Sequence, residues 1–191
     1  MLLARLLTSM KEDNGRVRIE HFYDDVAPLS KTEQRALAEA PDIDAELMRE
    51  FELGSTDSSP KKLVELITVP SLNIRGMAAS GVGDRASNVV PTHALAELDL
   101  RTTPEAPPEY LFGLIEQHVR GKGYYLTKGA PTEAERATHD RIASLTLGRG
   151  SKAARTPMES PLGQWVDGVL RKTFSTNGAD AARSEEHTSE L

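Results

Sequence analysis

The chain has 191 residues, of which 38% are hydrophobic, and a formal net charge of −6. This composition can build a globular core, whereas the acidic balance argues against nucleic-acid binding, which needs a clustered basic face. The sequence has no cysteine and no apolar run of membrane-spanning length, so we expect no disulfide, no thiolate chemistry and no membrane partner. The compartment stays open: the cytoplasm is slightly favoured, but a segment upstream of Met1 could carry a targeting signal.

The first quarter of the chain predicts short helices. The amphipathic stretch from Met1 to Leu7 reads as a helix, and capping, acidic-start and proline signals indicate helices over residues 34–40 and 45–51. Ser30 and Glu33 have the spacing of a capping box, in which two side chains satisfy unpaired amides of the first helical turn. Pro41 then ends that helix.

The centre of the chain predicts a long β-hairpin. Residues 73–77 and 93–101 mix apolar and polar side chains near period two, and Gly81 and Gly83 between them supply turns with few steric limits. A short apolar helix face over residues 63–67 precedes this hairpin.

Helices and strands continue after the hairpin. The pattern predicts a helix over residues 110–119, strands over 124–126 and 142–147, and an amphipathic helix over 160–174. The inward face of this last helix is expected to hold Leu162, Trp165, Val166, Val169 and Leu170. Strands that flank a helix in this order predict an α+β fold, a two-layer sandwich whose antiparallel sheet is covered by helices on one face.

The last nine positions need separate treatment. Residues 183–191 look like the translation of a sequencing-library adapter, so we expect the natural sequence to stop near Ala182. The glutamates and His187 in this tail could suggest a metal site, but a polar terminal tail usually has no fixed structure. We therefore assign no function to the tail.

Several motifs occur in an order that resembles a known family. They are Phe22-Tyr23-Asp24-Asp25, the stretch from Pro70 to Gly76, the Gly-x-Gly loop at Gly81, and Asn88-Val89-Val90-Pro91 before a strand that ends in Arg101. Together they resemble the lid, or dimerisation, domain of the zinc-dependent metallopeptidases that include carnosinases, aminoacylases and succinyl-diaminopimelate desuccinylases. The resemblance runs from Met1 to about Phe174.

The resemblance implies that the chain is an internal fragment with three parts. Residues 1–129 would form an N-terminally incomplete lid domain, and residues 130–182 would begin the α/β segment that returns to the catalytic domain. Residues 183–191 would be the artefact tail. The parent protein would be a homodimer through its lid domains, would hold two zinc ions, and would hydrolyse the amide bond of dipeptides or N-acyl amino acids.

Metal-ligating residues are not expected in this piece. A two-zinc site needs converging histidines and carboxylates, and none of the five histidines stands in the His-x-Asp motif that the family uses. Asp24 and Asp25 are the one tempting acidic pair, but consecutive residues of an extended segment point to opposite sides. We therefore expect no catalytic residue, no bound zinc and no activity in the chain by itself.

Two residues match family positions that contact substrate. The resemblance implies that Arg101 holds the substrate carboxylate, for which its planar fork is suited, and that Asn88 hydrogen-bonds near the scissile group. The alternatives are that Arg101 pairs with a surface acid and that Asn88 is a turn residue. On one continuous strand the two would lie on the order of 40 Å apart. A two-fold dimer could then combine Asn88 of one subunit with Arg101 of the other.

A second hypothesis comes from a different class of protein. The chain could be a stand-alone, non-catalytic α/β-sandwich module that mediates dimerisation or ligand binding. Upstream sequence with a His-x-Asp motif and an acidic pair would favour the peptidase hypothesis, whereas a stop codon before Met1 would favour the module.

Overall fold

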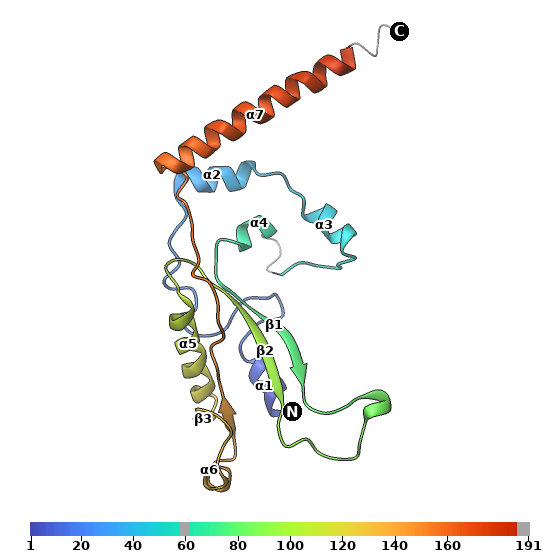
Figure 1. Cartoon of the computed structure of the whole chain (residues 1–191), viewed down its shortest axis with the longest axis vertical. Helices are drawn as coiled ribbons and strands as arrows, with labels where there is room; N and C mark the ends of the chain where they lie inside the picture. The colour runs from blue at the N-terminus through green and yellow to red at the C-terminus, as the bar shows by residue number, and fades with distance from the viewer. Residues whose placement is uncertain (58–61, 187–191) are drawn as a thin grey trace. The chain divides into compact units, whose positions relative to one another are not determined.

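The computed structural model describes residues 1–57 and 62–186, which form two compact units (Figure 1). The first unit contains Met1–Pro28 and Pro41–Ala154, and the second contains Leu29–Ala40 and the chain from Arg155 onward. The boundary near residue 129 that the resemblance implies stays a prediction.

The described residues form helices joined to two short sheets. The helices are α1 (Leu2–Thr8), α2 (Lys31–Glu39), α3 (Asp44–Glu50), α4 (Leu63–Leu66), α5 (Pro108–Gly121), α6 (Glu133–Thr138), α7 (Pro161–Glu186) and the 3-10 turn η1 (Gly83–Arg85). The strands are β1 (Ser71–Ala78), β2 (Leu95–Arg101), β3 (Tyr125–Thr127) and β4 (Ile142–Ser144). Antiparallel pairing of β1 with β2 beside these helices confirms the predicted α+β class. Within the described residues, no helix is long and apolar enough to cross a membrane.

The hairpin β1–β2 contains a bulge that the sequence pattern did not predict. The register runs from Ser71 opposite Arg101 to Ala78 opposite Leu95, and it shifts between Ile74 and Gly76. Arg75 is therefore the extra residue. Because alternate residues of a strand share a face, the shift places Met77 on the face of Leu72 and Ile74 and keeps one face of the hairpin apolar.

The core of the first unit forms where this apolar face meets α1, α5 and the segment between residues 17 and 22. Its buried members are Leu6, Leu7, Met10, Val17, Ile19, Phe22, Leu72, Ala106, Leu111, Leu114, Ile115 and Val119. In α5, Leu111, Ile115 and Val119 follow the four-residue spacing of one helix face. Pro108 opens α5 at a position where a missing amide hydrogen costs nothing, and Gly123 follows its end with φ of +82°.

The second sheet is parallel. Tyr125 pairs with Ile142 and Thr127 with Ser144, and α6 lies in the crossover between the two strands, as parallel pairing requires. Leu126 and Ala143 of this sheet pack against the core. The sequence pattern predicted both strands, although the second ends at Ser144 rather than at residue 147.

In the second unit, α2 packs beside the start of α7. Ser30 and Glu33 form the predicted capping box, and Arg155 donates to the Glu33 carboxylate at 2.6 Å. The hydrogen bond from the Ser30 backbone, followed by the one from Arg155, lowers the pKa of Glu33. These contacts fix where the polypeptide enters α7.

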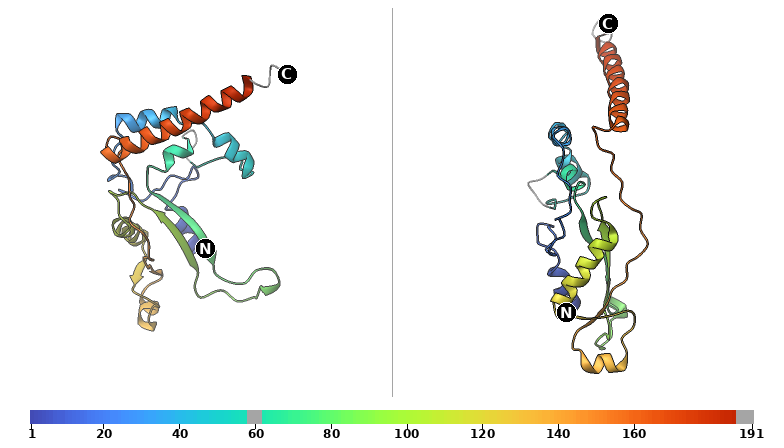
Figure 2. Two further views of the ribbon diagram at one scale, coloured as in Figure 1. Left: turned by 45° about the horizontal axis from the view of Figure 1, so that its top comes forward. Right: turned by 90° about the vertical axis from the view of Figure 1, so that its left-hand side faces the viewer.

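Helix α7 is longer than predicted and exposes its apolar face. It is continuous from Pro161 to Glu186 (Figure 2), so it includes residues 183–186 of the expected artefact tail; residues 187–191 lie outside the described part. The side chains expected to face inward are exposed instead: Leu162, Trp165, Val166, Val169 and Leu170, with Phe174 beside them. Within the described residues this face has no cover.

Trp165 gives a direct optical test of this exposure, since it is the one tryptophan in the chain. Its side chain is 65% exposed, so we expect red-shifted emission and efficient quenching by iodide in the folded chain, close to the quenching seen in urea. A dilution series controls for self-association. Shielded, blue-shifted emission that persists at high dilution would contradict the exposed position of the α7 face.

Candidate functional site

Arg101 ends β2 on the polar face of the hairpin. Its Nε donates a hydrogen bond of 2.7 Å to Oδ2 of Asp99, two residues earlier on the same strand. The arginine side chain is 75% exposed and the aspartate side chain 29% exposed. The sequence left open that Arg101 pairs with a surface acid, and the structure shows this pair. Substrate binding by Arg101 stays a prediction.

The polar face continues from Asp99 across to β1 and to Lys11, which follows the end of α1. Asp99 lies opposite Asn73 in the ladder, and the Lys11 ammonium donates to Asn73 Oδ1 and Asp57 Oδ2, both at 2.9 Å. Two cations, Lys11 and Arg101, and three carboxylates, Asp57, Glu97 and Asp99, therefore lie on or beside this face. Strand alternation could have indicated that Asn73, Asp99 and Arg101 share a face, but only the register shows which residue lies opposite which.

Asn88 lies in the loop between the strands and not on a strand. The prediction of a strand from residue 93 was wrong at its start, because β2 begins at Leu95. Pro91 lacks an amide hydrogen for a ladder, and residues 79–94 form an exposed connection that extends beyond the hairpin (Figures 1 and 2). The seven residues of β2 span roughly 20 Å, so the strand separates Arg101 from this loop.

The loop depends on its two glycines. A Cβ on Gly81 would collide with the carbonyl oxygen of Arg85, and Gly83 has φ of +60°, which favours glycine. Val82, Val89 and Val90 are all exposed beside them. The loop thus presents the Asn88 amide together with apolar side chains.

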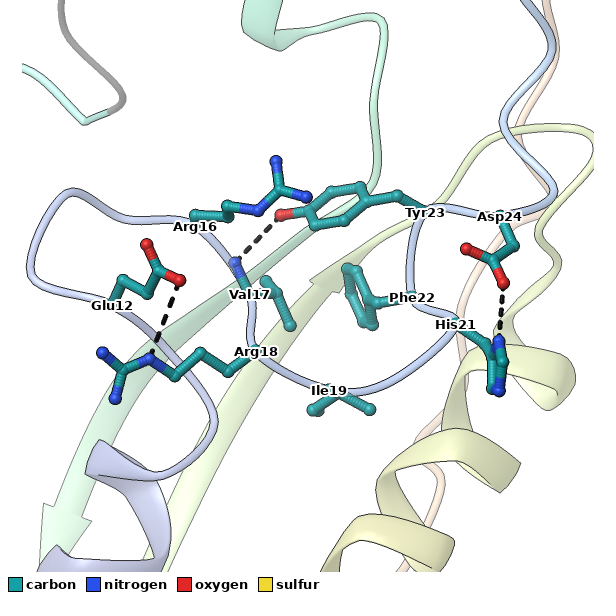
Figure 3. Close-up of a pocket in the computed structure, with 9 residues that line it drawn as sticks. All are labelled: Glu12, Arg16, Val17, Arg18, Ile19, His21, Phe22, Tyr23 and Asp24. Carbon is teal, nitrogen blue, oxygen red and sulfur yellow. Dashed lines mark hydrogen bonds and ion pairs between the residues drawn. The ribbon is translucent and has the colours of Figure 1, made fainter.

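A hollow of about 480 Å³ lies beside the Phe22-Tyr23-Asp24-Asp25 motif (Figure 3). Its polar groups bind one another: the Tyr23 hydroxyl accepts from the backbone amide of Val17 at 3.0 Å, and His21 Nδ1 lies 2.6 Å from Asp24 Oδ2. The hydrogen bond to Asp24 raises the pKa of His21. The motif is therefore a folding element that positions the buried Phe22.

The described residues do not fit a metal centre. Asp24 binds His21, and Asp25 hydrogen-bonds to the Tyr110 hydroxyl, which raises the pKa of Tyr110. Across residues 1–57 and 62–186, no group of three or more histidines and carboxylates is placed to hold a metal ion. No step of a metal-dependent reaction can be assigned to these side chains.

His118 joins α5 to the end of α1. Its Nε2 lies 2.9 Å from Ser9 Oγ, whose hydroxyl donates to the Leu6 carbonyl at 2.7 Å. With the serine proton on the Leu6 carbonyl, the His118 tautomer that carries a proton on Nε2 donates to Ser9. Burial, followed by the nearby Lys122, lowers the pKa of His118. The pair is therefore a structural clamp between the end of α1 and α5.

The chain is similar to known dipeptidases over part of its length. No family model matches it. It is 26% identical over 123 residues to a β-Ala-His dipeptidase from Rattus norvegicus and 27% identical over 123 residues to a Cys-Gly metallodipeptidase from Saccharomyces cerevisiae. These matches cover 61% and 63% of this chain, but 24% and 25% of the two relatives. The chain thus spans about a quarter of the length of the curated relatives it matches.

A solved structure supports the same relationship. An M20 family metallo-carboxypeptidase from Sulfolobus solfataricus superposes with a TM-score of 0.55 and 30% sequence identity, over 63% of this chain and 28% of that protein. The homologues of the chain are therefore Cys-Gly and β-Ala-His dipeptidases, and its structural neighbours are M20 family metallopeptidases. The predicted resemblance is confirmed at this level.

The His118 clamp predicts a pH dependence of stability. Because the folded state lowers the pKa of His118 below the ordinary value of 6.5, the unfolded state binds more protons between the two values. Stability should therefore fall as the pH drops below about 7, and His118→Gln should reduce this loss. Urea unfolding at several pH values measures it, with His93→Gln in the exposed loop as the control. An unchanged pH profile in His118→Gln would contradict the assignment.

Proposed function

We propose that this chain is a lid segment of a larger, metal-dependent dipeptidase that hydrolyses the amide bond of dipeptides or N-acyl amino acids. The similarity to dipeptidases, which covers most of this chain but about a quarter of each relative, carries the proposal. In this proposal the metal centre would hold two zinc ions and would supply an activated water, and its ligands would come from other parts of the protein. The segment contributes substrate contacts and the dimer interface.

Arg101 is proposed to bind the substrate carboxylate. Its guanidinium is exposed, carries a permanent charge and can grip a carboxylate through two parallel hydrogen bonds. The contact with Asp99 occupies Nε, which leaves the terminal nitrogens for a ligand. A carboxylate at this position would orient the amide bond to be cleaved.

Asn88 is proposed to act in the site of the partner subunit. The hairpin holds Arg101 at one end of β2, and the loop that carries Asn88 leaves from the other end. Two subunits related by a two-fold axis could bring both groups into a single site, because each subunit would then supply its loop to the site of the other. The exposed valines of the loop would be covered in such a dimer.

The apolar face of α7 is consistent with a segment of a larger protein. Six neighbouring apolar side chains of this helix are exposed, from Leu162 to Phe174, and such a continuous face is usually packed against another element. In the proposal, the catalytic domain covers it.

The first test compares the chain with the full-length protein that carries it. We expect the purified chain to bind no stoichiometric zinc after dialysis and to hydrolyse no dipeptide, because the described residues offer no metal centre. The full-length protein should do both and should lose activity with a chelator. Chelator-sensitive turnover by the chain alone would contradict the lid assignment, and an inactive full-length protein would favour the stand-alone module.

The second test addresses the composite site in the full-length dimer. Asn88→Ala and Arg101→Ala should each impair the homodimer, since a lost hydrogen bond to a charged group costs about 1.5–3 kcal/mol. Co-expression should restore activity toward half of wild type per heterodimer, because one site then carries both defects and the other carries none. Confirmed heterodimers without recovery would show that the two groups do not meet across the interface.

A further inference from the structure

The contact between Asp99 and Arg101 is specific in its geometry. The two residues share the polar face of β2, and one carboxylate oxygen accepts from Nε at 2.7 Å. This is a short, charge-assisted hydrogen bond. Arginine has five N–H donors in a rigid plane, so a bond to Nε alone restrains the guanidinium and leaves the four terminal hydrogens unused within the described residues.

Asp99 is itself held in place by the hairpin. Its backbone lies in the ladder opposite Asn73, and its side chain is much less exposed than that of Arg101. Asn73 is fixed in turn by the Lys11 ammonium, which also binds Asp57. The arginine is therefore tethered to a side chain of a strand that is paired in the ladder.

A guanidinium that Asp99 already orients has an entropic advantage in binding a ligand. An arginine that is free to move loses side-chain conformational entropy when it binds a ligand, whereas a pre-oriented guanidinium loses less.

We propose that Asp99 is a positioning residue that orients the Arg101 fork for the substrate carboxylate. This inference rests on the proposed function of Arg101. Asp99 acts through Nε and does not touch the substrate. The residue would thereby increase affinity for substrates that end in a free carboxylate, without a part in the chemical step.

The experiment measures the kinetics of the full-length protein with Cys-Gly and with its C-terminal amide. Asp99→Ala should raise KM for Cys-Gly about five-fold and change kcat by less than about two-fold, as expected for the loss of an exposed ion pair that orients a binding group. The amide, which lacks the carboxylate, should be unaffected. Asp99→Asn keeps an acceptor oxygen for Nε and should restore KM to within about two-fold of wild type.

Two further variants make the result decisive. Glu97→Ala, one alternation earlier on the same face, is the matched control for loss of a carboxylate and should leave KM unchanged. If Asp99 acts through Arg101 alone, Asp99→Ala should have no effect in an Arg101→Ala background. A near-ultraviolet circular dichroism spectrum checks that each variant is folded.

Three outcomes would overturn the inference: an unchanged or lowered KM in Asp99→Ala, an equal effect on the amide, or an effect that survives in the Arg101→Ala background. A lowered KM would identify Asp99 as a competitor for the guanidinium. Failure of the proposed function looks different, because Arg101→Ala alone would then leave KM for Cys-Gly unchanged.

Discussion

The first unit depends on covering one face of a two-stranded hairpin. A β-ribbon of two strands is marginal in water, and it becomes stable when its apolar face packs against other elements. Here Leu72 and its neighbours on β2 meet a stripe of α5 that includes the fully buried Leu111 and Val119. Because this packing fixes which side of the hairpin is inside, it also fixes the opposite side as the polar face that carries Asp99 and Arg101.

The polar face is therefore a product of the core and not an independent motif. Its side chains alternate with those that pack inside, so the register of the core residues sets the register of the polar ones. The clamp between Ser9 and His118 also stabilises this arrangement, since it connects the end of α1 to α5. Substrate contacts placed on such a strand inherit the rigidity of the packed layer beneath them.

Local signals in the sequence predicted local structure well. The capping box of Ser30 and Glu33 depends on residues three positions apart, and the helical stripe of α5 on spacings of four, so both were visible without the fold. The partner of each strand was not visible: the parallel pairing of β3 with β4 and the bulge at Arg75 depend on contacts between distant residues. The same limit applies to the site, because Lys11 reaches Asn73 only once the strands are assembled.

The bulge at Arg75 has a consequence for how this hairpin can change during evolution. If Arg75 were deleted, Ile74 and Gly76 would still meet Leu98 and Glu97, so the ladder would close without exchanging its faces. A bulge bends a strand and increases its twist. The half of the ribbon beyond residue 75 can therefore be re-aimed by the loss of one amino acid, while the half that packs in the core stays as it is. Deletion of Arg75 thus offers a way to redirect the loop of residues 79–94 without rebuilding the core.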